Sequence, residues 1–297
     1  MAHSIKGGVL LLPILLAGSC SLSTFAPPES ESHEVDFAEA LDFALLAEAA
    51  YLTEDEIQDR YPDRRLVTGD VPASDVRYLV LFDDDARTQD ISIRGTSNLE
   101  NVRVDVEFIP DPDDTLGLYL HSGFARAGKE LYERIRNDLD QDYATTATGH
   151  SLGGAAAVIL SLYLQADGYD VTAVRTFGQP KVTNLGGARR TGDLPIIRFV
   201  NGTDPVPDLP PLLVPDLAWA YTHFGPQVIL WGEDRYIYLE SFQALWAGGV
   251  SFWTNLGDHE IVEHQMESYV KSLQGLQAGS TEIRFAERGA FPPDAPR

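Results

Sequence analysis

Cysteine is nearly absent from this sequence: Cys20 is the only one among 297 residues. A lone cysteine cannot form a disulfide within one chain, so the fold must rest on a buried apolar core. Hydrophobic residues make up 44% of the chain and aromatic residues 10%, which is enough for a core of ordinary size. The length favours one large domain or two small ones.

Basic residues are scarce too, with 22 Lys and Arg against 45 Asp and Glu and a formal net charge of -23 at pH 7. Binding a phosphate backbone needs clustered Lys and Arg, so the composition argues against a nucleic-acid partner. The sequence also lacks a metal-ligand cluster, a phosphate-cradling loop and a dinucleotide fingerprint at useful spacing. We therefore expect no metal and no cofactor.

The apolar run near the start, residues 9–16, is too short for a membrane-spanning helix. It follows Lys6 and precedes small residues and Cys20, which is the layout of a signal peptide. Cys20 stands where a bacterial lipoprotein signal would be cut, although Ala17 replaces the Leu usual in such signals. We expect residues 1–20 to be a lipoprotein-type signal and Cys20 to hold the protein on an envelope membrane, on the periplasmic or outer-membrane side. Plain secretion is the alternative.

Residues 21–34 are rich in Ser, Pro and Glu and predict a flexible tether. Beyond it we expect a single domain over residues 35–297, because neither a repeat nor a second linker divides the chain. Apolar residues at helical spacing predict a helix over residues 36–51. Two β-rich runs, 78–82 and 91–93, predict adjacent strands.

Helical and strand patterns alternate along the rest of the chain. We expect, in order, a helix over 124–139, a strand over 144–148, a helix over 155–164, strands over 171–177 and 196–200, a hairpin of 228–231 and 236–239, and a closing helix over 258–273. This alternation predicts an α/β fold with a central, mostly parallel sheet flanked by helices.

The motif Gly149-His150-Ser151-Leu152-Gly153 lies between a predicted strand and an Ala/Leu-rich helix. Glycines in G-x-S-x-G permit the sharp strand-to-helix turn that lifts a serine hydroxyl clear of its backbone. We expect Ser151 to be a catalytic nucleophile. The alternative is a Gly-rich helix start with an inert serine.

The longer string GHSLGG resembles the class 3 lipases, the family of the fungal triacylglycerol lipases. Further blocks match in the same order over roughly residues 37–275: IRGTS at 93–97, HSGF at 121–124, FGQPKV at 177–182, VNGTDPVP at 200–207 and YTHFG at 221–225. The resemblance implies an α/β-hydrolase fold and a carboxylic-ester hydrolase that cleaves acylglycerol or other lipid esters through an acyl-serine intermediate. Triacylglycerols, phospholipids and feruloyl esters stay open as substrates. The alternative function is a non-catalytic envelope lipoprotein that binds lipid or a protein partner.

A serine nucleophile needs a histidine base, and the base needs an acid that fixes its tautomer. In α/β hydrolases the order along the chain is Ser, acid, His. Asp204 follows a predicted strand and precedes Pro205, and by resemblance it is the triad acid. Asp208 is the nearest rival.

Chain order and resemblance reduce seven histidines to two candidate bases, His259 and His264. His264 resembles the start of the family's His-x-Met-x-x-Tyr helix, and counting from it places Met266, Tyr269 and Leu273 on one apolar stripe. We favour His264, at the first turn of the closing helix. His259 is the alternative.

By resemblance, the Leu152 amide and Thr96 would form the oxyanion hole, although Thr96 also fits a simple strand end. Residues 97–105 fall where fungal members carry a lid helix, but several charged side chains make this segment polar. The apolar stretch 242–253 would either cover the acyl groove, touch a membrane or belong to the core.

Overall fold

The computed structural model describes residues 33–72, 74–95, 110–210, 220–240, 244 and 262–283. The predictions for Cys20, Thr96, residues 97–105 and His259 fall outside these ranges. So do the predicted signal over residues 1–20 and all of 242–253 except Ala244.

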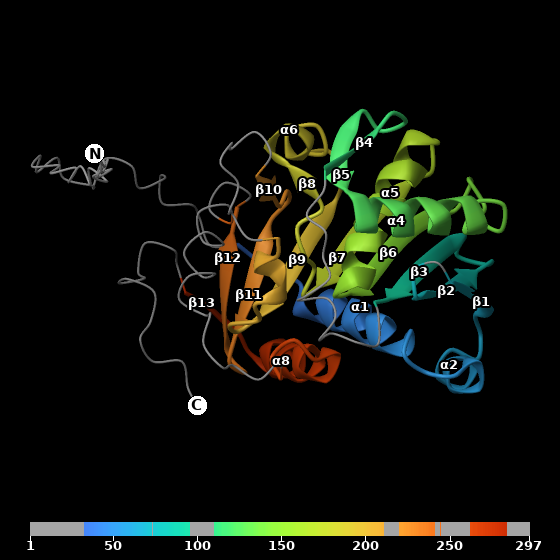
Figure 1. The fold of residues 1–297 in the computed structure, drawn as a ribbon. Coiled ribbons are helices and arrows are strands. Elements are labelled where there is room, and N and C mark those ends of the chain that lie inside the picture. Colours follow the sequence, from blue (N-terminus) through green and yellow to red (C-terminus); the bar gives the residue numbers. More distant parts are fainter. Residues whose placement is uncertain are drawn as a thin grey trace, which may run out of the picture. The chain divides into compact units, whose positions relative to one another are not determined.

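A mixed, mostly parallel sheet forms the centre of the described domain (Figure 1). Within the described residues it has nine strands in the order β1-β2-β3-β6-β7-β9-β11-β12-β13. They are β1 (Arg65–Val71), β2 (Val76–Asp83), β3 (Thr88–Arg94), β6 (Ala144–His150), β7 (Val171–Phe177), β9 (Ile196–Asn201), β11 (Gln227–Trp231), β12 (Arg235–Leu239) and β13 (Thr281–Glu282). The strands from β3 to β11 pair in parallel, as do β12 and β13. The β1–β2, β2–β3 and β11–β12 pairs are antiparallel. The predicted α/β class and mostly parallel sheet are confirmed.

Helices cover both faces of this sheet (Figure 1). On one face α5 (Leu152–Ala166) packs between the sheet and α4 (Ser122–Ile135), and on the other α1 (Phe37–Ala49) packs against α8 (Met266–Ala278). Every residue of α5 from Gly153 to Leu164 is buried, as expected for a helix that is apolar all round. Shorter helices are α2 (Glu54–Arg60), α6 (Leu185–Ala188) and the 3-10 turn η2 (Val206–Asp208).

A second, smaller sheet has the order β10-β8-β5-β4. Its strands are β4 (Pro110–Asp113), β5 (Leu118–His121), β8 (Thr183–Asn184) and β10 (Tyr221–Thr222), and their pairings are antiparallel. The sequence did not predict this sheet, because strands of two to four residues leave no readable alternation.

The predicted closing helix over 258–273 is wrong at its start. Residues 262–265 form turns, Gln265 is the N-cap, and α8 begins at Met266, so His264 precedes the helix. In a continuous helix the His264 carbonyl would accept from the amide of Ser268. Instead the Ser268 amide donates to Gln265 O, and the His264 carbonyl faces the ring of His150.

The folded domain includes the last residues of the predicted tether. The His33 ring stacks on Tyr238 at 4.0 Å, and the Tyr236 hydroxyl donates to His33 O at 2.7 Å. The tether prediction can therefore apply only to residues before His33. Within the described ranges, every helix is too short or too polar to cross a bilayer.

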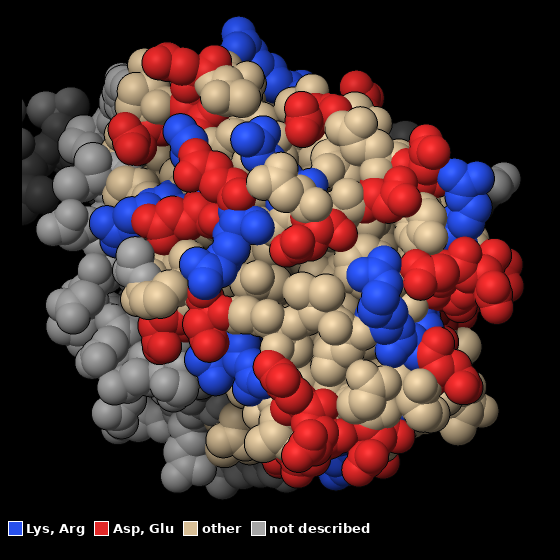
Figure 2. All heavy atoms as spheres, turned by 90° about the vertical axis from the view of Figure 1, so that its right-hand side faces the viewer, with Lys and Arg blue, Asp and Glu red and all other residues tan. Residues whose placement is uncertain are grey.

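Charges of both signs are interspersed on the face seen in Figure 2. At the β1–β3 edge of the sheet, Arg65 pairs with Asp84 at 3.2 Å and Arg87 with Asp142 at 3.3 Å. The described part of this face therefore carries no continuous basic patch (Figure 2).

Candidate active site

Ser151 occupies a strained turn between β6 and α5, with φ 58° and ψ -129°. A β-carbon on Gly149 would lie 2.4 Å from Gly153 O, and one on Gly153 would lie 2.1 Å from Ile93 O. The motif glycines are thus required where β6, α5 and β3 approach closely. This geometry is the strand–turn–helix that the G-x-S-x-G pattern predicted.

The surroundings of Ser151 are buried and polar. Its side-chain oxygen is enclosed and has no hydrogen-bond partner within the described residues. The amide of Leu152 belongs to the first turn of α5, where backbone N–H groups lack an intrahelical acceptor and favour negative charge. A β-carbon on Gly95 would lie 3.1 Å from this amide nitrogen, so the end of β3 reaches the start of α5.

Asp204 and His264 form a buried pair. The His264 Nδ1–H donates to Asp204 Oδ2 at 2.7 Å, and both side chains are fully buried. Because a carboxylate only accepts, this contact assigns a proton to Nδ1, and Nε2 is the acceptor whenever the ring is neutral. His264 Nε2 is buried and has no partner within the described ranges.

The charge of His264 and the hydrogen bonds to Asp204 together favour its ionised form. Its Oδ2 also accepts from the Tyr269 hydroxyl at 2.5 Å, and its Oδ1 accepts from the Val206 amide at 2.9 Å. Burial alone would raise the pKa of Asp204, but the charge of His264 and these hydrogen bonds together lower it below its ordinary value. The rival acid, Asp208, lies in η2, where its backbone oxygen accepts from Lys181 Nζ at 2.6 Å.

The end of β7 lies between Ser151 and the His264–Asp204 pair. Phe177 O accepts from the Ser151 amide at 2.9 Å. A β-carbon on the next residue, Gly178, would lie 2.9 Å from both Asp204 Oδ2 and His264 Nδ1. Gly178 has φ 61°, so both its conformation and this close approach require glycine. The ends of β6, β7 and β9 thus bring the predicted nucleophile, acid and base into one region.

His150, the neighbour of Ser151, contacts the backbone of His264. Its Nε2 lies 2.6 Å from His264 O, and its Nδ1 lies 2.8 Å from the Tyr51 hydroxyl. Since a carbonyl only accepts, Nε2 carries the proton and Tyr51 donates to Nδ1. Burial, followed by the charge of His264, lowers the pKa of His150 to about 3. A neutral ring with both nitrogens engaged in this way supports the local structure and is not available as the base.

Sequence reasoning missed several contacts of this site. Tyr269 was expected only on an apolar stripe, and Tyr51, Gly178 and Glu263 were not singled out. The available signals were that Gly178 lies in the FGQPKV block and that Tyr269 is the tyrosine of the His-x-Met-x-x-Tyr match. Within the described residues, no group of three or more His, Cys, Asp or Glu could hold a metal ion.

Residues 91–214 match the model of the family described as Lipase (class 3). The chain is 32% identical over 161 residues to secreted mono- and diacylglycerol lipase 1 of Fusarium solani, covering 50% of this chain and 46% of the relative. It is 34% identical over 167 residues to a lipase of Rhizomucor miehei, covering 52% and 44%. The chain thus spans about half the length of these curated relatives.

Solved lipase structures share the fold. The native Rhizomucor miehei lipase propeptide complex superposes with a TM-score of 0.58 and 25% identity, covering 67% of this chain and 69% of that chain. A triacylglycerol lipase described as having a serine protease triad superposes with a TM-score of 0.56 and 25% identity, covering 67% and 82%. The described domain therefore has the α/β-hydrolase fold that the resemblance implied.

Proposed function

We propose that the chain is a carboxylic-ester hydrolase acting on acylglycerols, because residues 91–214 match the Lipase (class 3) model and the chain is similar to fungal lipases. Ser151 would be the nucleophile, His264 the base and Asp204 the acid. The observation that carries the proposal is the buried hydrogen bond from His264 Nδ1 to Asp204, beside the strained turn of Ser151.

The proposed reaction follows from the proton positions. Asp204 orients the imidazole, and His264 Nε2 removes the proton of Ser151 as its oxygen attacks the ester carbonyl carbon. The tetrahedral intermediate collapses, and the same nitrogen gives its proton to the departing alcohol. Water then attacks the acyl-serine by the reverse sequence, releasing the fatty acid and restoring Ser151.

We propose the Leu152 amide as one oxyanion donor, because the first-turn N–H groups of α5 lack an intrahelical acceptor and favour negative charge. Thr96 is the second proposed donor. Resemblance supports its choice, and so does the approach of the preceding residue, Gly95, to the Leu152 amide.

Thr96→Ala keeps the amide donor and removes the hydroxyl, so it should lower kcat by about 10-fold or more, as measured with a soluble ester.

A substrate panel tests the proposed function. The purified chain would be assayed with p-nitrophenyl esters of increasing length, with mono-, di- and triacylglycerols, with a phospholipid and with a feruloyl ester. We expect hydrolysis of acylglycerols that Ser151→Ala abolishes without unfolding the protein. Activity confined to the phospholipid or feruloyl ester would reassign the substrate. A folded wild type that hydrolyses none of them would favour the non-catalytic, lipid-binding alternative.

We also propose that Cys20 carries a diacyl anchor that tethers the mature enzyme to an envelope membrane. The proposal rests on the position of the lone cysteine after an apolar run and small residues. Mass spectrometry of the protein purified from membranes should find an acylated N-terminal Cys20. An unmodified N-terminus at another residue would support plain secretion, the state named for the relative from Fusarium solani.

A further inference from the structure

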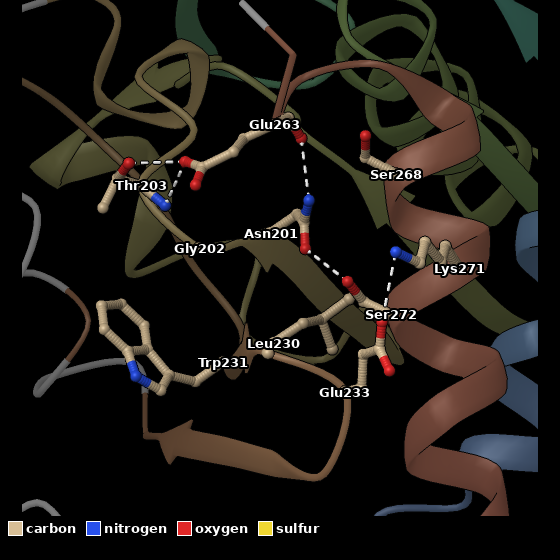
Figure 3. A pocket seen from close by; sticks show the side chains of 11 residues that line it. Asn201, Gly202, Thr203, Leu230, Trp231, Glu233, Glu263, Ser268, Lys271 and Ser272 are labelled. Atoms are coloured by element: carbon tan, nitrogen blue, oxygen red, sulfur yellow. Dashed lines mark hydrogen bonds and ion pairs between the residues drawn. The ribbon is translucent and has the colours of Figure 1, made fainter. Parts of the chain in front are cut away.

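Asp204 and His264 lie on two neighbouring segments. The residue directly before Asp204 and the residue directly before His264 connect these segments. Glu263 Oε2 accepts from the Thr203 amide at 2.8 Å and from the Thr203 hydroxyl at 2.5 Å. Figure 3 shows this carboxylate extending from the start of the closing segment toward the loop that follows β9. The link between Thr203 and Glu263 thus runs beside the hydrogen bond between Asp204 and His264.

The backbone of Glu263 is held by the last residue of β9, Asn201. Its carbonyl accepts from Asn201 Nδ2 at 3.1 Å, and Asn201 Oδ1 accepts from the Ser272 hydroxyl of α8 at 2.8 Å (Figure 3). Gly202, which follows Asn201, has φ 52°, and a β-carbon there would lie 3.0 Å from Glu263 Oε1. The close approach of the Glu263 side chain to this loop therefore needs glycine at position 202.

Outside the regular elements, His264 depends on contacts from other segments, such as the hydrogen bond from His150 Nε2 to its carbonyl at 2.6 Å and the link at Glu263. It lies in the turn before α8, so its backbone lacks the hydrogen-bond ladder of a helix. Asp204 likewise lies in the loop between β9 and η2. Hydrogen bonds to a carboxylate are stronger than neutral ones, so the two bonds from Thr203 to Glu263 restrict how far these segments can separate.

We infer that Glu263 is a positioning residue, which holds the His264 ring in register with the Asp204 carboxylate by binding Thr203. This inference rests on the proposed function, since it assigns the role to the same site. Misplacing a reacting group by about 1 Å can cost about 100-fold in rate, which makes a link at this position consequential.

The pocket that Glu263 lines supplies a matched control. It has a volume of about 250 Å³, and Lys271 and Glu233 also border it, paired at 3.2 Å (Figure 3). The Lys271 side chain is 75% exposed and belongs to the same pocket, but its ion pair is with Glu233 and not with the loop of Asn201 to Asp204. Lys271→Met therefore changes the pocket's charge without touching the link.

The kinetic experiment compares Glu263→Ala, Glu263→Gln and Lys271→Met on a short soluble ester. We expect Glu263→Ala to lower kcat by about 10- to 100-fold with KM within about 2-fold, because alignment is lost and substrate contacts are kept. Glu263→Gln should recover to within about 3-fold of wild type, since its amide oxygen can accept both Thr203 bonds. Lys271→Met should match wild type. Equal kcat in Glu263→Ala and wild type would overturn the inference.

A second readout needs no turnover. The Nδ1 proton of His264, shared with Asp204, should give a downfield proton NMR resonance, assigned by its loss in His264→Gln. We expect Glu263→Ala to shift or broaden this resonance and Glu263→Gln to restore it. An unchanged resonance in Glu263→Ala would contradict the positioning role. A shifted resonance in a protein without any esterase activity would refute the proposed function and leave the positioning role standing.

Thr203→Val keeps the inference testable if Glu263→Ala fails to fold. It removes the hydroxyl donor, retains the amide donor to Glu263, and adds no charge. We expect a smaller fall in kcat, about 3- to 10-fold, and a smaller shift of the His264 proton. A variant that melts at lower temperature while kcat and the resonance stay at wild-type values would reduce Glu263 to a structural role and overturn the inference.

Discussion

The backbone of Ser151 has a conformation that residues other than glycine rarely adopt. Its φ of 58° with ψ of -129° is favourable only without a β-carbon, and such strain costs about 1–3 kcal/mol. The hydrogen bond from the Ser151 amide to Phe177 O and the packing of α5 maintain it. Stability is thus exchanged here for the placement of one hydroxyl group.

This strain predicts that two substitutions at position 151 differ in stability. Ser151→Gly should raise the free energy of unfolding by about 1 kcal/mol relative to Ser151→Ala, because only the former removes the β-carbon. Both should lack esterase activity. Urea denaturation of the two variants measures the difference. A glycine variant that is no more stable than the alanine variant would show that the turn is unstrained.

At the element scale, the sequence predicted the long, regular parts of the fold. The helix expected over 155–164 lies within α5, and the strands expected over 171–177 and 196–200 correspond to β7 and β9. The helix α5 is buried and apolar over its whole middle, and β7 and β9 are rich in β-branched and aromatic residues, so their patterns are readable. The G-x-S-x-G turn was predictable for a different reason, because its glycines mark where two backbones meet.

The elements that the sequence missed lack such patterns. β1 is an edge strand, mostly exposed or half-buried, and its residues do not alternate in polarity. The start of α8 was misplaced, because the apolar spacing of Met266 and Tyr269 fixes a helix face but not its first residue. The contact of Glu263 with Thr203 joins positions far apart in the sequence, and a sequence without aligned relatives gives no signal for it.

The close crossing of β3 and α5 predicts a strong effect at the second motif glycine. Gly153→Ala would place its β-carbon at the Ile93 carbonyl, so β3 and the oxyanion region must shift. We expect the free energy of unfolding to fall by about 1–3 kcal/mol and activity to be lost. The measurements are urea denaturation and ester hydrolysis.

Gly192→Ala is the matched control for this substitution, because nothing lies within 4 Å of a β-carbon there. It should leave stability within about 0.5 kcal/mol and activity unchanged. A Gly153→Ala variant as stable and active as Gly192→Ala would show that β3 and α5 do not approach as closely as described.

For the molecule as a whole, buried neutral histidines set the response to acid. Burial lowers the pKa of His121 to about 4 and that of His150 to about 3, and burial also lowers the pKa of His223. In the unfolded chain each would have a pKa near 6.5. Between these values the unfolded state binds more protons than the folded state, so acid favours unfolding.

Stability should therefore fall as pH decreases from about 6.5 to about 4, by about 1.4 kcal/mol per pH unit for each such histidine. Falling pH also reduces repulsion among the many acidic side chains, which opposes this trend. His121→Phe isolates the histidine contribution, because His121 stacks on Phe124 and an apolar ring there does not titrate. Denaturation across this range should show a shallower slope in the variant, whereas identical slopes would contradict a neutral, buried His121.

The central claim, that His264 and Asp204 activate Ser151, is tested most directly by covalent labelling with a fluorophosphonate, which reacts only with an activated serine. Peptide mapping by mass spectrometry should find one adduct, on Ser151, in the wild type and none in Ser151→Ala. His264→Ala should slow labelling by about three decades, or about 4 kcal/mol, while His259→Ala should leave the rate nearly unchanged. Slow labelling in His259→Ala would move the base to that residue. An unlabelled Ser151 in a folded wild-type protein, or equal rates in wild type and both histidine variants, would contradict the account.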